Sequence, residues 1–294
     1  MAEVGLRAWQ ARSSEATFAL AAGELEEPGL TPFGIADRLL EGGGLKKVLA
    51  TGKPVADFEA YCSHLALVPH PGILSALTLA AESGADLSGV VSIRGHICDA
   101  GSLCALLALL PANRQLTTLK FWHCSLPADA VELLRGHLPP SITTLAVEAD
   151  ETPVSLLLTM PALKVASLRC CTFPAAEAVP LGAALGANST LTSLSLYCCL
   201  LGDAAIAPIA AALRLNASLL ALNLAKNMLT DVATEALLGA FTDPAPPDQA
   251  EGEEGEQAEA TDVAADEAVG GAIGTANRTL TALNLSGNLI GVQV

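Results

Sequence analysis

The chain has 294 residues, 51% of them hydrophobic but only 3% aromatic, and its formal net charge is -16. This apolar content is enough for a continuous core, and its aliphatic character suits repeated thin layers better than one thick core. The acidic excess argues against binding to nucleic-acid phosphates or to anionic membrane surfaces, so neither is an expected partner.

A mean hydropathy of +0.47 raises the question of membrane insertion. Two stretches without charged residues, 60–81 and 178–202, have the length of a bilayer span. The first contains Pro69 and Pro71, and the second contains polar residues such as Asn188, which lipid would leave unpaired. No signal-peptide pattern precedes them. We therefore expect a soluble cytoplasmic protein.

The first sixty residues contain no repeat. Two short helical or mixed elements are expected there, over 32–40 and 55–67, joined through a glycine-rich turn. A repeat protein has to shield the open end of its core. We therefore interpret residues 1–60 as a capping region and residues 61–294 as a repeat domain of about eight units.

Three segments that begin at Asn188, Asn216 and Asn277 share the pattern N-x-[ST]-L-x-x-L-x-L-x-x-[NC]-x-[LI]. The L-x-L part predicts a short strand with both leucines in the core, and the Asn or Cys is expected to turn inward and bond the neighbouring backbone. The pattern resembles the leucine-rich repeat.

Further units extend the pattern towards the amino terminus. A full match begins at Leu116, weaker matches begin at Cys62, Leu87 and Ile142, and a degenerate unit begins near Val165. Most first positions lie roughly 23 to 29 residues apart, as one repeat requires. The last interval, from Leu219 to Leu280, is longer and contains an insertion.

Helices are expected on the return segments, over 99–110, 128–134, 203–213 and 231–241. A strand and a helix at this period resemble the ribonuclease-inhibitor class of leucine-rich repeats, and the run 276–288 resembles the repeat regions of NOD-like receptors. The resemblance covers roughly 62–294. It implies an α/β solenoid, a horseshoe with parallel strands on its concave face and helices on its convex face.

Residues 243–270 are rich in Asp and Glu and almost free of large apolar side chains. We expect a disordered acidic insertion there, which is either a tolerated solvated loop or a contact for a basic partner. The sequence reaches Val294 directly after the last expected strand. We therefore expect a continuation of the chain, or another subunit of a complex, to cover the open C-terminal end.

Eight cysteines include the adjacent pairs 170–171 and 198–199 but no CxxC, and the five histidines have no metal-ligand spacing. No catalytic residue, metal or cofactor is therefore expected. Cys124 and Cys199 occupy the inward position of the repeat, whereas Cys171 and Cys198 are assigned to outward positions beside them. Three Asn-x-Ser/Thr sequons share one repeat position, so we interpret them as repeat chemistry, not as glycosylation sites.

The concave face is the expected binding surface. The assumed phase aligns one outward row through Lys120, Arg169 and Asn223, and a second through Trp122 and Tyr197. Aromatic and arginine side chains often anchor protein interfaces, although here they could also be incidental surface residues. The candidate partner-binding residues are Lys120, Trp122, Arg169, Tyr197 and Asn223.

These features favour a non-catalytic scaffold that binds a protein partner of unknown identity, within a larger assembly. High Ala, Gly and Leu usage is compatible with a GC-rich algal genome, in which such repeats also occur in cilia, so a ciliary or cytoskeletal complex is one expectation. The resemblance leaves two alternatives, a small-GTPase regulator similar to the Ran GTPase-activating protein and the ligand-sensing part of a NOD-like receptor.

Overall fold

The computed structural model describes residues 51–65, 67–82, 89–95, 100–124, 126, 128–148, 158–243 and 276–291. Within these residues helices and strands largely alternate along the chain. The α-helices are α3 (Pro54–His64), α4 (Pro71–Glu82), α5 (Ala100–Leu109), α6 (Ala128–His137), α8 (Ala178–Ala187), α9 (Ile206–Leu215) and α10 (Asp231–Phe241). Short 3-10 turns precede two of them, η3 (Ala175–Glu177) and η4 (Asp203–Ala205).

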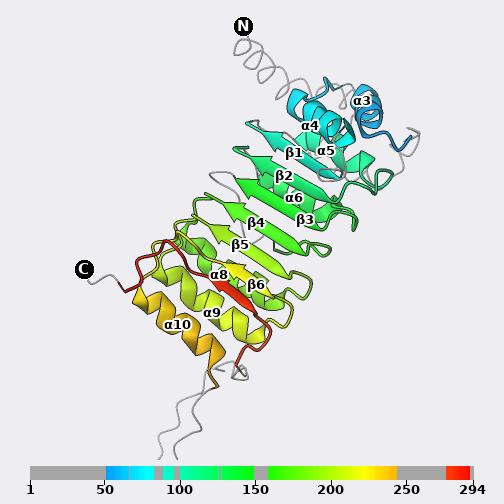
Figure 1. Ribbon diagram of the computed structural model, residues 1–294. Coiled ribbons are helices and arrows are strands. Elements are labelled where there is room, and N and C mark those ends of the chain that lie inside the picture. The colour runs from blue at the N-terminus through cyan, green and yellow to red at the C-terminus, as the bar shows by residue number, and fades with distance from the viewer. Residues whose placement is uncertain are drawn as a thin grey trace, which may run out of the picture.

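The strands form one seven-stranded sheet that is parallel throughout and follows the order of the chain. They are β1 (Val90–Arg94), β2 (Thr118–Trp122), β3 (Thr144–Glu148), β4 (Val165–Arg169), β5 (Ser193–Tyr197), β6 (Ala221–Asn223) and β7 (Ala282–Asn284). Helices lie in a second layer against one face of this sheet, and α4 lies beside β1 at the amino-terminal edge (Figure 1).

Alternation along each strand separates the two faces of the sheet. In β2, Leu119 and Phe121 are fully buried, whereas the outward side chains of Lys120 and Trp122 stay partly exposed. Leu119 pairs in register with Leu145 of β3, and the inward rows continue across the sheet. The core is therefore built from aliphatic layers between the sheet and the helices, as the composition suggested.

The amino-terminal end differs from the prediction. Cys62 lies in α3, and Leu65 and Leu67 follow this helix, so no repeat strand forms there. The first strand is β1, whose buried residues are Val91 and Ile93, one residue away from the assumed phase. The helix expected over 55–67 is confirmed in outline as α3. The element expected over 32–40 and nearly all of the acidic insertion lie outside the described residues.

The unit assigned to Val165 begins two residues earlier than predicted. Leu163, Ala166, Leu168 and Cys171 are buried, and they repeat the spacing of Leu191, Leu194, Leu196 and Cys199. The phase was missed because Ala166 replaces the first strand leucine, which left Val165 as the nearest large aliphatic residue. Cys171 is thus an inward residue, contrary to the prediction, and it occupies the inward Asn/Cys position of this unit.

The helices on the return segments largely match their predicted ranges. Helix α10 spans the predicted residues and is capped by Thr230, whose hydroxyl accepts a hydrogen bond from the backbone N–H of Val232. Helix α9 begins only after η4, where Asp203 accepts hydrogen bonds from the N–H and hydroxyl of Thr230 at 2.8 and 2.6 Å. Helix α8 was not predicted, because its alanine-rich sequence lacks a clear amphipathic period.

Inward Asn and Cys side chains join the turns that follow the strands. The Asn227 amide donates to the carbonyls of Leu196 and Leu224 at 2.7 and 2.9 Å and accepts from the N–H of Cys199 at 2.8 Å. Asn288 repeats this pattern one turn later. Each side chain thus satisfies backbone groups that a buried turn would otherwise leave unpaired.

A second asparagine ladder occupies the start of the repeat. The Asn216 amide donates to the carbonyls of Leu185 and Asn188, and its oxygen accepts from the N–H groups of Ser218 and Leu219. Asn188 and Asn277 make the equivalent bonds. The amide nitrogen that would carry a glycan is therefore used inside the fold at these three of the four sequons in the sequence.

The far edge of the sheet is less covered. In β7 all three residues are exposed, and the side chains of Leu283 and Leu289 are 37% and 47% accessible.

Within the described part of the chain, no helix has both the length and the apolar character that crossing a bilayer requires.

Asp57 joins α3 to the repeats and should make stability depend on pH. Its carboxylate accepts hydrogen bonds from the N–H of Thr51, the N–H of Gly52 and the amide of Asn113, at 2.7, 3.1 and 2.8 Å. Burial alone would raise the pKa of Asp57, but these hydrogen bonds outweigh it and hold the pKa below 3.8. Its stabilisation is therefore complete above the unfolded pKa and lost as the pH falls through the lower folded value.

We predict that Asp57→Asn lowers the free energy of unfolding by about 2 kcal/mol at pH 7, because charge-assisted hydrogen bonds are replaced by weaker ones. Denaturant unfolding monitored by circular dichroism should show the difference from wild type shrinking below pH 4. Glu59→Gln, at an exposed position on the same helix, is the control and should have no effect. An undiminished difference at low pH would contradict the assigned role of the charge.

Asn227→Ala should destabilise the fold by about 2–4 kcal/mol, because it leaves the buried N–H of Cys199 and the carbonyl of Leu196 without this hydrogen-bond partner. Asn284→Ala is a matched control, since Asn284 is exposed and its side chain accepts only one backbone hydrogen bond, from Ser286. Thermal and denaturant unfolding of both variants would measure the difference. Equal losses would show that the ladder carries no special stabilisation.

Candidate functional site

The face of the sheet opposite the helices, called the open face below, brings a row of functional side chains together. Pairing in register aligns Arg94, Trp122, Glu148, Arg169 and Tyr197 across β1 to β5. Each residue ends its strand, so the row runs along the carboxyl edge of the sheet. Trp122, Glu148 and Tyr197 are partly exposed, and Arg94 and Arg169 are exposed.

Arg169 makes the principal contacts of this row. Its guanidinium carbon lies 5.7 Å from the centroid of the Trp122 ring and 5.0 Å from that of the Tyr197 ring. Lys226 lies in the turn after β6, and its ammonium nitrogen is 5.4 Å from the centroid of the same Tyr197 ring. Cations and aromatic rings therefore alternate over four side chains, with each contact contributing about 0.5–1 kcal/mol at an exposed site.

The observed register corrects the predicted rows. Lys120 aligns with Ala146, Ser167, Ser195 and Asn223, so Arg169 does not belong to its row. The error follows from the two-residue shift of the unit that begins at Leu163. As a result, Trp122, Arg169 and Tyr197 lie in a single row, closer together than the predicted phase would have placed them.

Lys120 and Asn223 belong to the neighbouring row, not to the row that contains Arg169. Asn223 is partly buried, donates to the hydroxyl of Ser195 at 3.2 Å and accepts from the N–H of Ala225 at 3.0 Å. These bonds give its amide a local structural role. Lys120 lies on β2 towards the amino-terminal edge, next to Ser92 of β1.

Three charged residues of the open face were not among the predicted partner-binding residues. They are Arg94, Glu148 and Lys226. Arg94 was missed because the phase of β1 was wrong by one residue. Lys226 follows β6 in an exposed turn, where its backbone has a left-handed φ of 57°. It therefore lies outside the alternating strand pattern from which the rows were predicted. Glu148 lies 3.4 Å from the Nδ1 atom of His123, whose side chain is 77% exposed.

The cysteines divide into inward and outward groups. Cys124, Cys171 and Cys199 are buried, and their thiols donate weak hydrogen bonds to backbone carbonyls, for example from Cys199 to Tyr197 at 3.5 Å. Burial raises the pKa of Cys104 to about 12, and hydrogen bonding to Cys171 together with burial raises the pKa of Cys199. The thiols of Cys104 and Cys199 are therefore protonated at neutral pH.

Cys170 is the exposed cysteine of the described residues, and Cys198 beside it is partly exposed. The prediction that Cys198 faces outward thus agrees with the structure, whereas Cys170, not Cys171, is its outward neighbour. Partial burial and the nearby Cys198 raise the pKa of Cys170 above its ordinary value of 9.0. No cluster of three or more potential metal ligands occurs within the described ranges.

We predict that iodoacetamide modifies Cys170 faster than Cys171, because Cys170 is exposed and Cys171 is buried. The labelling rate at Cys170 should still increase with pH above pH 9, since its raised pKa shifts thiolate formation to higher pH. Tandem mass spectrometry of labelled peptides would follow each site in wild type, Cys170→Ser and Cys171→Ser. Labelling of Cys171 as fast as that of Cys170 would contradict the assigned orientation.

Comparison of the chain with known protein families and with curated proteins gives no match to either.

Proposed function

We propose that the chain is a leucine-rich-repeat solenoid of the ribonuclease-inhibitor type, a horseshoe whose concave side is the open face. Three features support this assignment. Each strand pairs in parallel with its sequence neighbours, buried leucines recur at fixed positions, and inward Asn or Cys side chains join successive turns. Such repeats present one extended surface built from the outward strand residues.

We further propose that the protein is a non-catalytic scaffold that binds a protein partner through the open face. The main support for this proposal is the row in which Arg169 lies between Trp122 and Tyr197, with Lys226 on the far side of Tyr197. Arg, Trp and Tyr are the residues that most often dominate binding energy at interfaces. Ring contacts already restrict the Arg169 side chain, so ordering it in a complex costs less entropy.

The charge of this face favours an acidic partner. The whole chain has 15 basic and 31 acidic residues. On the described strands and turns of the open face, however, the basic residues Arg94, Lys120, Arg169 and Lys226 accompany a single carboxylate, that of Glu148. A positive strip in an acidic protein would attract negatively charged surfaces to this face and repel them elsewhere.

Affinity capture from native extract followed by binding measurements with each purified partner would test the function. We expect partners to bind wild type and to be lost when Trp122, Arg169 and Tyr197 are all changed to Ala. Affinity should also fall as salt increases, because part of the attraction is between exposed charges. Circular dichroism would first establish that the variant retains its helix and strand content.

A matched control changes three side chains on the helical layer, Arg135, Val232 and Leu238, to Ala. Arg135 pairs with Glu132 of its own helix, and the other two side chains are 64% and 57% accessible. This variant should bind as wild type does. Partners that both variants retain, or that only the control loses, would rule out the open face as the binding surface.

A further inference from the structure

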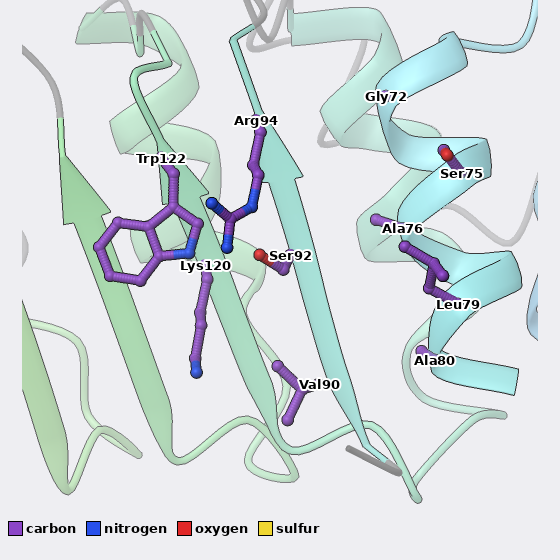
Figure 2. A pocket seen from close by; sticks show the side chains of 10 residues that line it. All are labelled: Gly72, Ser75, Ala76, Leu79, Ala80, Val90, Ser92, Arg94, Lys120 and Trp122. Carbon is purple, nitrogen blue, oxygen red and sulfur yellow. The ribbon is translucent and has the colours of Figure 1, made fainter. Parts of the chain in front are cut away.

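A pocket lies at the amino-terminal edge of the sheet, between α4 and the open face of β1 and β2. It encloses about 440 Å³. In Figure 2 the side chains of Arg94 and Lys120 lie beside the Trp122 indole, and α4 forms the opposite wall. The pocket is separate from the Arg169–Tyr197 contact, although Trp122 borders both.

One part of the lining is cationic. Arg94 and Lys120 come from paired strands, and within the described part of the chain neither side chain has an ion pair or a hydrogen bond. Arg94 is exposed and Lys120 is partly exposed. Two unpaired cations at one pocket would favour a bound anion, and the guanidinium of Arg94 can bind a carboxylate through two parallel hydrogen bonds.

Ser92 adds an unsatisfied polar group between these cations. It pairs in register with Lys120, and it lines the same pocket. Its hydroxyl oxygen is buried and has no hydrogen-bond partner among the described residues. A buried hydroxyl without a partner is destabilising, and a ligand oxygen that reached it would recover part of that cost.

The remaining lining is apolar. Ala76, Leu79 and Ala80 project from α4, and Val90 lies at the start of β1. The Leu79 side chain is 61% exposed although it faces this pocket, so its contact with water would be reduced by an occupant. The Trp122 ring supplies a flat wall against which an apolar or aromatic group can pack.

We propose that this pocket is a binding site for a carboxylate attached to an apolar or aromatic group. The carboxylate binds Arg94 and Lys120 and approaches Ser92, while the apolar body packs between α4 and Trp122. Two sources have this chemistry, a free organic acid and an acidic side chain beside an aromatic residue in a protein partner. The site shares Arg94, Lys120 and Trp122 with the proposed binding face, but it requires no interaction with Arg169 or Tyr197, so it can be tested separately.

Trp122 provides a direct readout. The chain has two tryptophans, so Trp9→Phe leaves Trp122 as its only one. In this background, titration with 3-phenylpropionate should give a saturable fluorescence change with a dissociation constant on the order of millimolar, as expected for a ligand of this size. The neutral analogue 3-phenyl-1-propanol should bind at least tenfold more weakly, and inorganic phosphate, which lacks the apolar body, should bind more weakly than the acid.

Variants assign the binding to the two cations. Arg94→Met and Lys120→Met should each weaken 3-phenylpropionate binding at least tenfold and leave the alcohol unaffected. Lys164→Met is the matched control, because it removes an exposed cation that does not line the pocket. Equal affinity for acid and alcohol, or unchanged binding in both pocket variants, would overturn the proposal.

Capped dipeptides distinguish the two sources. If N-acetyl-Phe-Asp-amide binds more tightly than 3-phenylpropionate, the natural ligand is a segment of a protein partner. If it binds more weakly, the natural ligand is a free organic acid. N-acetyl-Phe-Asn-amide removes only the charge and should bind less tightly than the Asp peptide. Failure of all the carboxylates to bind wild-type protein would exclude the site, without bearing on partner capture through Arg169 and Tyr197.

Discussion

The fold depends on satisfying the backbone of buried turns. Parallel strands at this spacing require the chain to leave the sheet, form its return segment and come back in register, so polar groups at each turn are removed from water. The inward side chains of Asn227 and Asn288 bond the turn before and their own turn at once. Because the same residue satisfies two turns, it couples neighbouring repeats and fixes their register. The leucine layers can then pack between the sheet and the helices.

The two halves of the sheet solve this problem with different chemistry. Asn227 makes hydrogen bonds of 2.7 and 2.9 Å to the carbonyls of Leu196 and Leu224 and also accepts from backbone N–H groups. Cys124 and Cys171 donate through longer contacts, such as 3.5 Å from the Cys171 thiol to the carbonyl of Arg169. A thiol is a weak donor and a weak acceptor. The β2 to β4 region therefore relies more on apolar packing, and α3 and α4 protect it at the end of the sheet where Asp57 bonds Asn113.

Much of the fold follows from the sequence wherever leucine occupies the first of the two inward strand positions. The units that begin at Leu116, Leu191 and Leu219 have the predicted phase, and their strands and inward residues form as expected. The prediction failed where small or branched residues replace leucine. Ala166 hid the true start of the β4 unit, and β1 carries Val91 and Ile93 instead of a leucine pair. Periodicity cannot identify a phase when several neighbouring residues are equally apolar.

These phase errors matter more for the candidate site than for the fold. A sheet of parallel strands forms at either phase, but a shift of one or two residues changes which side chains share a row. With the correct register, Arg169 moves from the row of Lys120 to that of Trp122 and Tyr197, and Arg94 joins them. Separate strands thus supply cations to a face where Glu148 is the one carboxylate on the described strands. Because the remainder of the chain is strongly acidic, this local reversal of charge supports the proposal of an acidic partner, which net charge alone would not suggest.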